Sequence, residues 1–189
     1  RTLTVVEHVL CNEVNRQIVE TLETFGVDAV GLHTLDSGVL FGERLYLEDE
    51  GRKIYLGFVG KVNRVNGHLI EAVCRAGTIP VLASLAADPS GQRLNCNADT
   101  AAGEVAHSMQ AEKFVVLSDT HGIRTDIEDP DSNIPEITAA EIRALIADGT
   151  IAGGMLPKVE ACLRALDGGV KRTHIIDGRF PHSLLLEIF

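Results

Sequence analysis

Short apolar runs alternate along this chain with longer segments whose apolar residues recur at helical spacing. Parallel strands need long crossover connections, usually helices, so this alternation favours a mostly parallel central sheet with helices on both faces. We therefore predict an α/β fold, a three-layer αβα sandwich, with a β-hairpin excursion over residues 40–56. The expected strands are 29–32, 78–85, 113–118 and 173–176, and the expected helices are 2–25, 65–76, 100–109, 138–147, 155–166 and from 183 onward.

The chain has 189 residues, enough for one well-buried domain, and it contains no repeat or linker. We therefore predict a single domain over residues 1–189. The first residue, Arg1, already opens a segment of helical spacing with a broad apolar face, which we expect to be exposed in this chain because the sheet edge that it should cover lies upstream. The last residue, Phe189, ends an apolar run. We expect both ends to be cut from something longer, with N-terminal strands and a C-terminal tail missing.

Charge and composition exclude several classes of partner. The net charge of −10 argues against a nucleic-acid or membrane-surface partner, since both need a basic face. No apolar run approaches the ~20 residues of a membrane span, and no signal peptide opens the chain, so we expect a cytoplasmic protein. The four cysteines and seven histidines show no zinc spacing, which favours reduced thiols and no metal site.

Residues 95–99 read Asn-Cys-Asn-Ala-Asp, directly before a helix of small residues. Asn or Asp at a helix start can cap it, but three such groups in five residues exceed what a cap needs. Taken alone, this run is explained equally well as a capped turn. Ligands of parallel sheets gather at the carboxyl ends of strands, so these polar side chains are also candidates for a binding site.

A second candidate loop follows the buried strand that ends at Ser118. Gly122 permits close backbone approach or a positive φ, as loops that bind nucleotides require. A tight strand-to-loop turn explains the same pattern. His121 could be a general base, although most such histidines are partly exposed loop residues.

A third segment, residues 153–158, reads Gly-Gly-Met-Leu-Pro-Lys and opens a helix. Pro157 suits the first helical turn, and the two glycines leave the backbone open to a ligand. Lys158 gains nothing from the positive end of the helix dipole, so its place there suggests an anionic ligand between them. The alternative is a solvated lysine. The chain lacks the G-x-x-x-x-G-K-S/T, G-x-G-x-x-G, H-R-D and G-x-S-x-G signatures.

In chain order, these segments resemble the N-acetylglutamate kinases of the amino-acid kinase family. The family carries V-N-K, L-G-F-V-G, N-x-N-A-D, L-S/T-D-x-x-G-I and G-G-M-x-P-K. This chain shows, in the same order, residues 14–16 (Val-Asn-Arg), 56–60 (Leu-Gly-Phe-Val-Gly), 95–99, 117–123 and 153–158, followed by 174–179 (His-Ile-Ile-Asp-Gly-Arg). The resemblance covers essentially the whole chain.

The resemblance implies ATP-dependent phosphorylation of the γ-carboxylate of N-acetyl-L-glutamate, the second step of arginine biosynthesis, with Mg²⁺ carried by ATP. Lys158 would stabilise the charge of the transferring phosphoryl group, and Asp99 would orient the phosphate lysines. Asn95, with Asn97 as a weaker candidate, would bind the substrate. Arg1 matches a family arginine that grips a substrate carboxylate.

The resemblance also implies the nucleotide site and a regulatory one. The nucleotide would be lined by Asp119, Thr120, His121, Gly122, Ile123, Arg124, Thr150, Ile151 and Ala152. The C-terminal segment resembles the arginine-sensitive, typically hexameric branch, in which Glu187 would face the guanidinium of an arginine effector and His174 would flank it. A homo-oligomer, dimeric or hexameric, is therefore expected.

The chain departs from the family at several points. The K-x-G-G and H-G-G-G motifs would lie before Arg1, and residues 31–34 read Gly-Leu-His-Thr where the family reads G-L-S-G, so the second glycine of that motif is replaced. Three alternatives stay open. They are a kinase of N-acetylaminoadipate or a related acylated amino acid, a catalytically inactive regulatory member of the family, and, more distantly, a NAD-binding fold.

Overall fold

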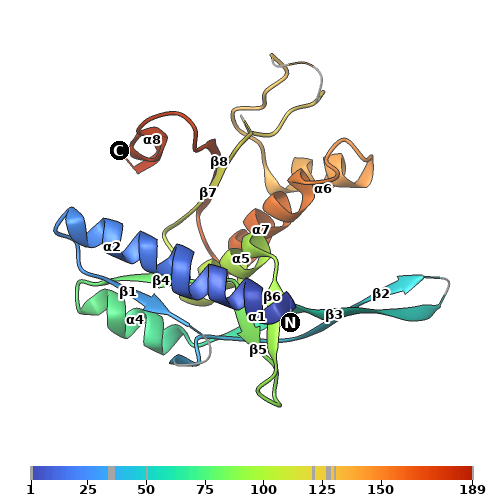
Figure 1. The fold of residues 1–189 in the computed structure, drawn as a ribbon. Coiled ribbons are helices and arrows are strands. Elements are labelled where there is room, and N and C mark those ends of the chain that lie inside the picture. Colours follow the sequence, from blue (N-terminus) through green and yellow to red (C-terminus); the bar gives the residue numbers. More distant parts are fainter. Residues whose placement is uncertain are drawn as a thin grey trace.

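The computed structural model of the protein describes residues 2–33, 37–49, 51–120, 122–126, 129 and 131–188. Helices and strands alternate along most of the chain, which confirms the predicted α/β class (Figure 1). In chain order the elements are α1 (Thr2–Glu7), η1 (His8–Asn15), α2 (Arg16–Thr24), β1 (Ala29–Leu32), β2 (Leu40–Asp49), β3 (Arg52–Val65), α4 (Gly67–Arg75), β4 (Ile79–Leu82), β5 (Leu85–Ala87), β6 (Arg93–Cys96), α5 (Ala98–Met109), β7 (Lys113–Ser118), α6 (Ala139–Ala147), α7 (Met155–Asp167), β8 (Arg172–Asp177) and α8 (Ser183–Ile188).

Parallel pairing is confirmed for two pairs of strands. β1 pairs with β4, and β7 pairs with β8 over their full length, from Lys113 opposite Arg172 to Ser118 opposite Asp177. The predicted hairpin is also confirmed, since β2 and β3 are antiparallel and project from the body of the molecule (Figure 1). Among the described residues these strands do not form one continuous sheet. A closed barrel of β2, β3, β6 and β5 lies beside the two parallel pairs.

The expected strand over residues 78–85 is wrong in its second half. β4 ends at Leu82, and the chain then forms the short hairpin of β5 and β6. Asp88 holds the hairpin turn, because its Oδ1 accepts hydrogen bonds from the Ser90 N–H at 2.9 Å and the Gln92 N–H at 3.0 Å. The Ser90 hydroxyl also donates to Asp88, and this bond lowers the pKa of the Asp88 carboxyl. β6 therefore leads directly into the Asn-x-Asn-Ala-Asp run.

The first helix is continuous from α1 to α2, but its middle part, η1, is a π-helix. Asn15, at the end of η1, is buried and donates from Nδ2 to the Val81 carbonyl at 2.9 Å, which ties the helix to β4. The apolar face of this helix is largely exposed, as expected. Val5 is 58% exposed and Phe25 78% exposed. Among the described residues, the main strand contact of α2 is with the four-residue β1 and that of α1 is with β6, so little sheet surface covers this helix.

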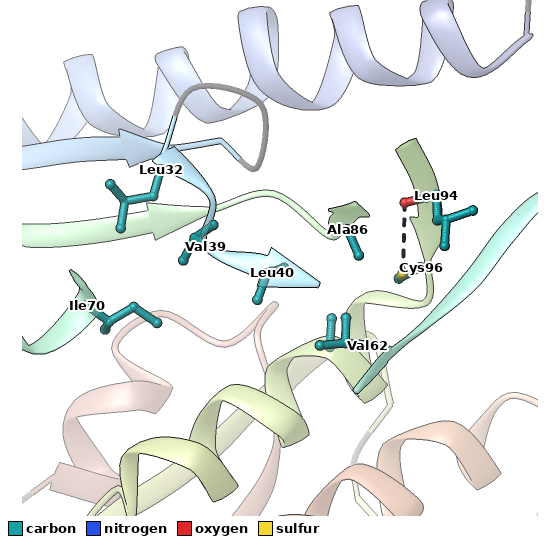
Figure 2. Close-up of a cluster of buried hydrophobic side chains, with 9 residues drawn as sticks. Leu32, Val39, Leu40, Val62, Ile70, Ala86, Leu94 and Cys96 are labelled. Atoms are coloured by element: carbon teal, nitrogen blue, oxygen red, sulfur yellow. Dashed lines mark hydrogen bonds between the residues drawn. The ribbon is translucent and has the colours of Figure 1, made fainter. Parts of the chain in front are cut away.

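Three clusters of buried apolar side chains form the core. The largest fills the space between the barrel, β1 and α4, and its members labelled in Figure 2 are Leu32, Val39, Leu40, Val62, Ile70, Ala86, Leu94 and Cys96. A second cluster joins β7 to α5 and α7. A third, around Ile123, Ile142, Ile151 and Val159, lies between α6, α7 and the loops that follow β7. This third cluster supports the candidate site.

Helix starts follow their capping residues. The predicted capping box of α6 is confirmed, with Thr138 and Glu141 satisfying each other's backbone N–H groups. Asn66 caps α4 by accepting from the Leu69 N–H, so this helix begins two residues later than expected and Val65 belongs to β3. In the part of the chain that is described, no helix is long and apolar enough to cross a bilayer.

Cysteine reactivity provides a test of this core. Burial raises the pKa of the Cys96 thiol to about 11 and raises the pKa of Cys162 as well, whereas Cys74 is exposed. Because the thiolate is the reactive form, we expect iodoacetamide at pH 8 to modify Cys74 rapidly and Cys96 only after unfolding. Peptide mass spectrometry with and without denaturant measures this difference. The variant Cys74→Ser should lose the fast phase. Equal rates for Cys74 and Cys96 in the folded protein would contradict the described core.

Candidate functional site

A cavity of about 1000 Å³ opens at the carboxyl ends of β7 and β8, beside the start of α7. This is the edge of a parallel strand pair where ligands of α/β proteins bind. The volume is sufficient for a nucleotide-sized ligand. The cavity is lined by Asp119, Thr120, Gly122, Ile123, Arg124, Gly149, Thr150, Ile151, Ala152, Gly153, Gly154, Met155, Lys158 and Arg179.

The loop after β7 forms one wall of this cavity. Ser118 ends the strand with its side chain largely buried, and its hydroxyl lies 3.2 Å from the Thr120 hydroxyl. Gly122 has φ +108°, and a Cβ built there would lie 3.1 Å from Oδ1 of Asn133. A side chain at Gly122 would be strained by this φ and would crowd the neighbouring loop. The glycine therefore lets the backbone turn tightly along the cavity wall.

The start of α7 forms the opposite part of the lining. Gly154 precedes the helix without any side-chain cap, and a Cβ added at Gly153 or Gly154 would meet nothing within 4 Å. The positive end of the helix dipole at this start attracts an anion, although Pro157 has no N–H and the Leu156 N–H donates to the Gly153 carbonyl at 3.3 Å. Lys158, the fourth residue of α7, lines the same cavity. The arrangement combines a cation with the positive end of a helix, which suits phosphate groups.

Lys158 is paired with Asp99, the residue for which the family resemblance implies a role in orienting the phosphate lysines. The Lys158 Nζ lies 3.0 Å from Oδ2 of Asp99, and both side chains are about one-fifth exposed. Asp99 is in the first turn of α5, which packs closely on α7. A Cβ at Gly103, one turn after Asp99, would lie 2.8 Å from the Ala161 carbonyl oxygen. The glycine thus allows the two helices to approach until the lysine reaches the carboxylate.

The two asparagines of the Asn-x-Asn-Ala-Asp run have different surroundings. Asn97 is the N-cap of α5, and its Oδ1 accepts from the Thr100 N–H at 2.9 Å. Asn95 lies half-buried in β6, and within the described ranges its side chain makes no hydrogen bond to the protein. Neither asparagine lines the cavity of Lys158. Capping explains Asn97, whereas Asn95 keeps its amide available for a ligand.

The structure gathers most of the predicted nucleotide residues around one cavity. Asp119, Thr120, Gly122, Ile123, Arg124, Thr150, Ile151 and Ala152 all line it. His121 and Arg1 lie outside the described residues. Across the described ranges, no group of three or more His, Cys, Asp or Glu side chains is arranged to hold a metal ion.

The two residues predicted to bind an effector contact each other. Nδ1 of His174, on β8, lies 2.5 Å from Oε2 of Glu187, on α8, and both side chains are partly buried. Lys113 donates from Nζ to the Glu187 backbone carbonyl. The His174 Nε2 is buried and has no hydrogen-bond partner among the residues that are described. The contact of His174 with Glu187 therefore joins α8 to β8, and the hydrogen bond from Lys113 joins α8 to β7.

Sequence reasoning did not name Gly149, Met155 or Arg179 as residues that line the cavity. Arg179 follows β8, and its Nε and Nη2 donate to the two carboxylate oxygens of Asp177 at 2.9 and 2.7 Å. These hydrogen bonds raise the pKa of the Arg179 guanidinium above its ordinary value. The rule that ligands lie at the carboxyl ends of parallel strands could have found this residue, because β8 pairs with β7.

Comparisons with known proteins match this geometry. The amino acid kinase family matches residues 1–177. A protein of Symbiobacterium thermophilum named acetylglutamate kinase is 47% identical over 190 residues, which cover all of this chain and 65% of that protein. Another acetylglutamate kinase, from Synechococcus elongatus, is 48% identical over 188 residues, with 100% of this chain and 60% of that protein covered. A solved structure from Streptococcus mutans UA159 has a TM-score of 0.78 and 29% identity, covering 93% of this chain and 67% of that chain.

Proposed function

We propose, from the premise that this chain belongs to the amino acid kinase family, that the protein carrying it phosphorylates N-acetyl-L-glutamate with MgATP. The product would be N-acetyl-L-glutamyl 5-phosphate, in the second step of arginine biosynthesis. The observation that carries this proposal is the cavity in which eight predicted nucleotide residues meet Lys158, which is itself held by Asp99. The names and identities of the curated relatives support the choice of substrate.

The proposed reaction needs little covalent chemistry from the protein. A γ-carboxylate oxygen of the substrate forms a bond to the γ-phosphorus, while the bond from that phosphorus to the bridging oxygen breaks and ADP leaves with the electron pair. Both reactants are anions, so charge neutralisation and alignment carry most of the catalysis. Lys158 would stabilise charge on the transferring group, and Asp99 would hold the lysine in place.

The substrate would lie on the side of β6 and the start of α5. Asn95 is the better candidate of the two asparagines, because the Oδ1 of Asn97 already accepts the capping hydrogen bond. Arg1 would grip a carboxylate of the substrate. We further propose that residues 1–189 act as a single domain of a cytoplasmic homo-oligomer.

Replacement of Lys158 tests the catalytic assignment. In the full-length protein, Lys158→Ala should lower kcat by on the order of 10²-fold or more, as expected for loss of a preorganised charge stabiliser. The melting temperature should change little, because the lysine is partly exposed. A coupled assay of ADP release with N-acetylglutamate, run beside thermal melting, measures both. Near-normal turnover by this variant would remove Lys158 from the mechanism.

The two asparagines form a matched pair of variants. Asn95→Ala should raise the KM for N-acetylglutamate by about 5- to 150-fold, the equivalent of about 1–3 kcal/mol for a lost polar contact, and leave ATP affinity unchanged. Asn97→Ala should instead lower the free energy of unfolding by about 1 kcal/mol, because α5 loses its cap, with little change in KM. Steady-state kinetics and urea unfolding separate the two effects. If Asn95→Ala weakens ATP binding alone, Asn95 belongs to the nucleotide side.

We also propose that arginine inhibits the full-length enzyme at a site that includes Glu187 and His174. Support comes from the carboxylate of Glu187, which can pair with a guanidinium, and from its closeness to His174. A guanidinium arriving at Glu187 would compete with His174 for the same carboxylate. Binding there could thus shift α8 relative to β8.

The rate at increasing arginine concentration, with N-acetylglutamate held near its KM, tests this regulation. We expect inhibition of the wild type and much weaker inhibition of Glu187→Gln, which keeps the shape of the side chain and removes its charge. A wild-type rate that is insensitive to millimolar arginine would refute the regulation. Inhibition of equal strength in both proteins would exclude Glu187 from the effector site.

A further inference from the structure

A second ion pair joins α5 to α7, in addition to the pair of Lys158 with Asp99. Arg164 of α7 donates from Nε to Oε1 of Glu104 at 2.8 Å and from Nη2 to Oε2 at 3.0 Å. The Glu104 side chain is only 14% exposed, whereas that of Arg164 is 43% exposed. The backbone carbonyl of Arg164 also accepts a hydrogen bond from Nδ1 of His107, on α5, at 3.1 Å. Both the side chain and the main chain of Arg164 are therefore held by α5.

The contacts between the two helices follow one another in the same direction along both of them. In order, they join Asp99 to Lys158, Gly103 to Ala161, Glu104 to Arg164 and His107 to Gly168, which follows α7. The two helices therefore run side by side in the same direction. Arg164 comes after Lys158 on one continuous helix, at a distance of about 9 Å along its axis. A helix of this length moves as one body, so a shift of Arg164 along the axis shifts Lys158 as well.

The packing between the helices fixes their distance more firmly than their relative position along the axis. The buried side chains that α5 and α7 contribute to the second apolar cluster are all small: Ala106, Ala161, Cys162 and Ala165. Small side chains form shallow ridges, which oppose the sliding of one helix along another less than large interlocking side chains do. A bidentate Arg–carboxylate pair does oppose sliding, because two parallel hydrogen bonds must be kept at once. The pair of Glu104 with Arg164 is therefore the contact best suited to set the register of α7 on α5, meaning its position along the axis of α5.

We propose that Glu104 and Arg164 are positioning residues that set this register and thereby hold Lys158 at its place in the cavity. Neither residue lines the cavity, so both act through Lys158 and not on a ligand. A displacement of about 1 Å at a catalytic group can lower the rate by ~100-fold, so the register matters for phosphoryl transfer. The reaction rests on the proposed function, whereas the register of the two helices does not depend on it.

Steady-state kinetics of the full-length protein provide the first test. Glu104→Gln keeps the shape of the side chain and removes its charge, and it should lower kcat on the order of 10-fold with little change in melting temperature or in the KM for N-acetylglutamate. Arg164→Lys keeps the charge but not the paired hydrogen bonds, so it should show the same loss. In a protein that already carries Lys158→Ala, Glu104→Gln should change kcat by less than about twofold. Arg143→Ala, which removes the ion pair of α6 with Asp167 on α7, is the matched control and should keep its kcat.

A second test needs no kinase activity. Acetic anhydride acetylates free lysine amines, and peptide mass spectrometry follows the rate at Lys158. Asp99→Asn removes the carboxylate that holds this lysine and gives the reference rate for a released side chain. Glu104→Gln should raise the wild-type rate by about two- to fivefold, the range expected when a partly exposed ion pair is lost, and Arg143→Ala should leave it unchanged.

Other outcomes overturn the inference. If kcat is unchanged in Glu104→Gln or in Arg164→Lys, the bidentate pair does not position the lysine. If Glu104→Gln lowers kcat equally with and without Lys158, Glu104 acts by another route. An equal loss in Arg143→Ala would assign the effect to general loosening of α7, and an unchanged acetylation rate in Glu104→Gln would exclude a change of register. Absence of turnover by the wild type with N-acetylglutamate and MgATP would instead refute the proposed function, and the acetylation rates would then decide the inference on their own.

Discussion

The close contact between α5 and α7 is the constraint on which the candidate site depends. Gly103 faces the backbone of Ala161 so closely that any side chain at position 103 would force the helices apart. On each helix the functional residue lies about one turn before this contact: Asp99 precedes Gly103, and Lys158 precedes Ala161. Because residues three or four apart share a helix face, the contact also brings the lysine to the carboxylate. A larger side chain at position 103 would therefore separate Lys158 from Asp99, although it would touch neither of them.

The strand pair of β7 and β8 provides the second fixed element. Its parallel register places Ser118 opposite Asp177, so the loops after both strands begin at the same edge. One loop carries Asp119 and Gly122, and the other carries Arg179. The third apolar cluster supports the walls of the cavity, because Ile123 and Ile151 belong to this cluster. The cavity is thus built from strand ends and one helix start, as the chemistry of anionic ligands in α/β folds requires.

The sequence predicted best where local chemistry determines structure. The capping box at Thr138 and the bounds of the strand that ends at Ser118 were predicted from the residues. The expected full burial of that strand is wrong, because Leu117 is 56% exposed. The role of Asp99 beside Lys158 was implied by the family resemblance alone. Prediction failed where tertiary contacts decide. The β5–β6 hairpin depends on the turn held by Asp88. The strands on both sides of this turn are so short that their sequence resembles that of a loop. The exposed apolar face of the helix from α1 to α2 was expected only from the sheet edge that it should cover, because spacing alone does not say how much sheet surface will cover it.

The same distinction applies to the candidate site. Residues in recognisable motifs were predicted, and eight of them line one cavity with Lys158. Arg179 and Asp177 belong to the quoted segment 174–179, but Arg179 was not named as a nucleotide residue because its place at the cavity comes from the pairing of β8 with β7. The capping role of Asn97 could be read from its position before a helix, yet only the structure separates it from Asn95, which lies in a strand and keeps its amide unpaired within the described residues.

The central claim is that Asp99 acts in catalysis through Lys158. A double-mutant cycle on kcat tests it most directly, with Lys158→Ala, Asp99→Ala and the double variant of the full-length protein assayed for phosphoryl transfer to N-acetylglutamate. If the two residues act as one unit, the double variant should be no slower than Lys158→Ala alone, within about twofold. Losses that multiply in the double variant would mean that the two residues act independently, and would contradict the account of the site given by their ion pair.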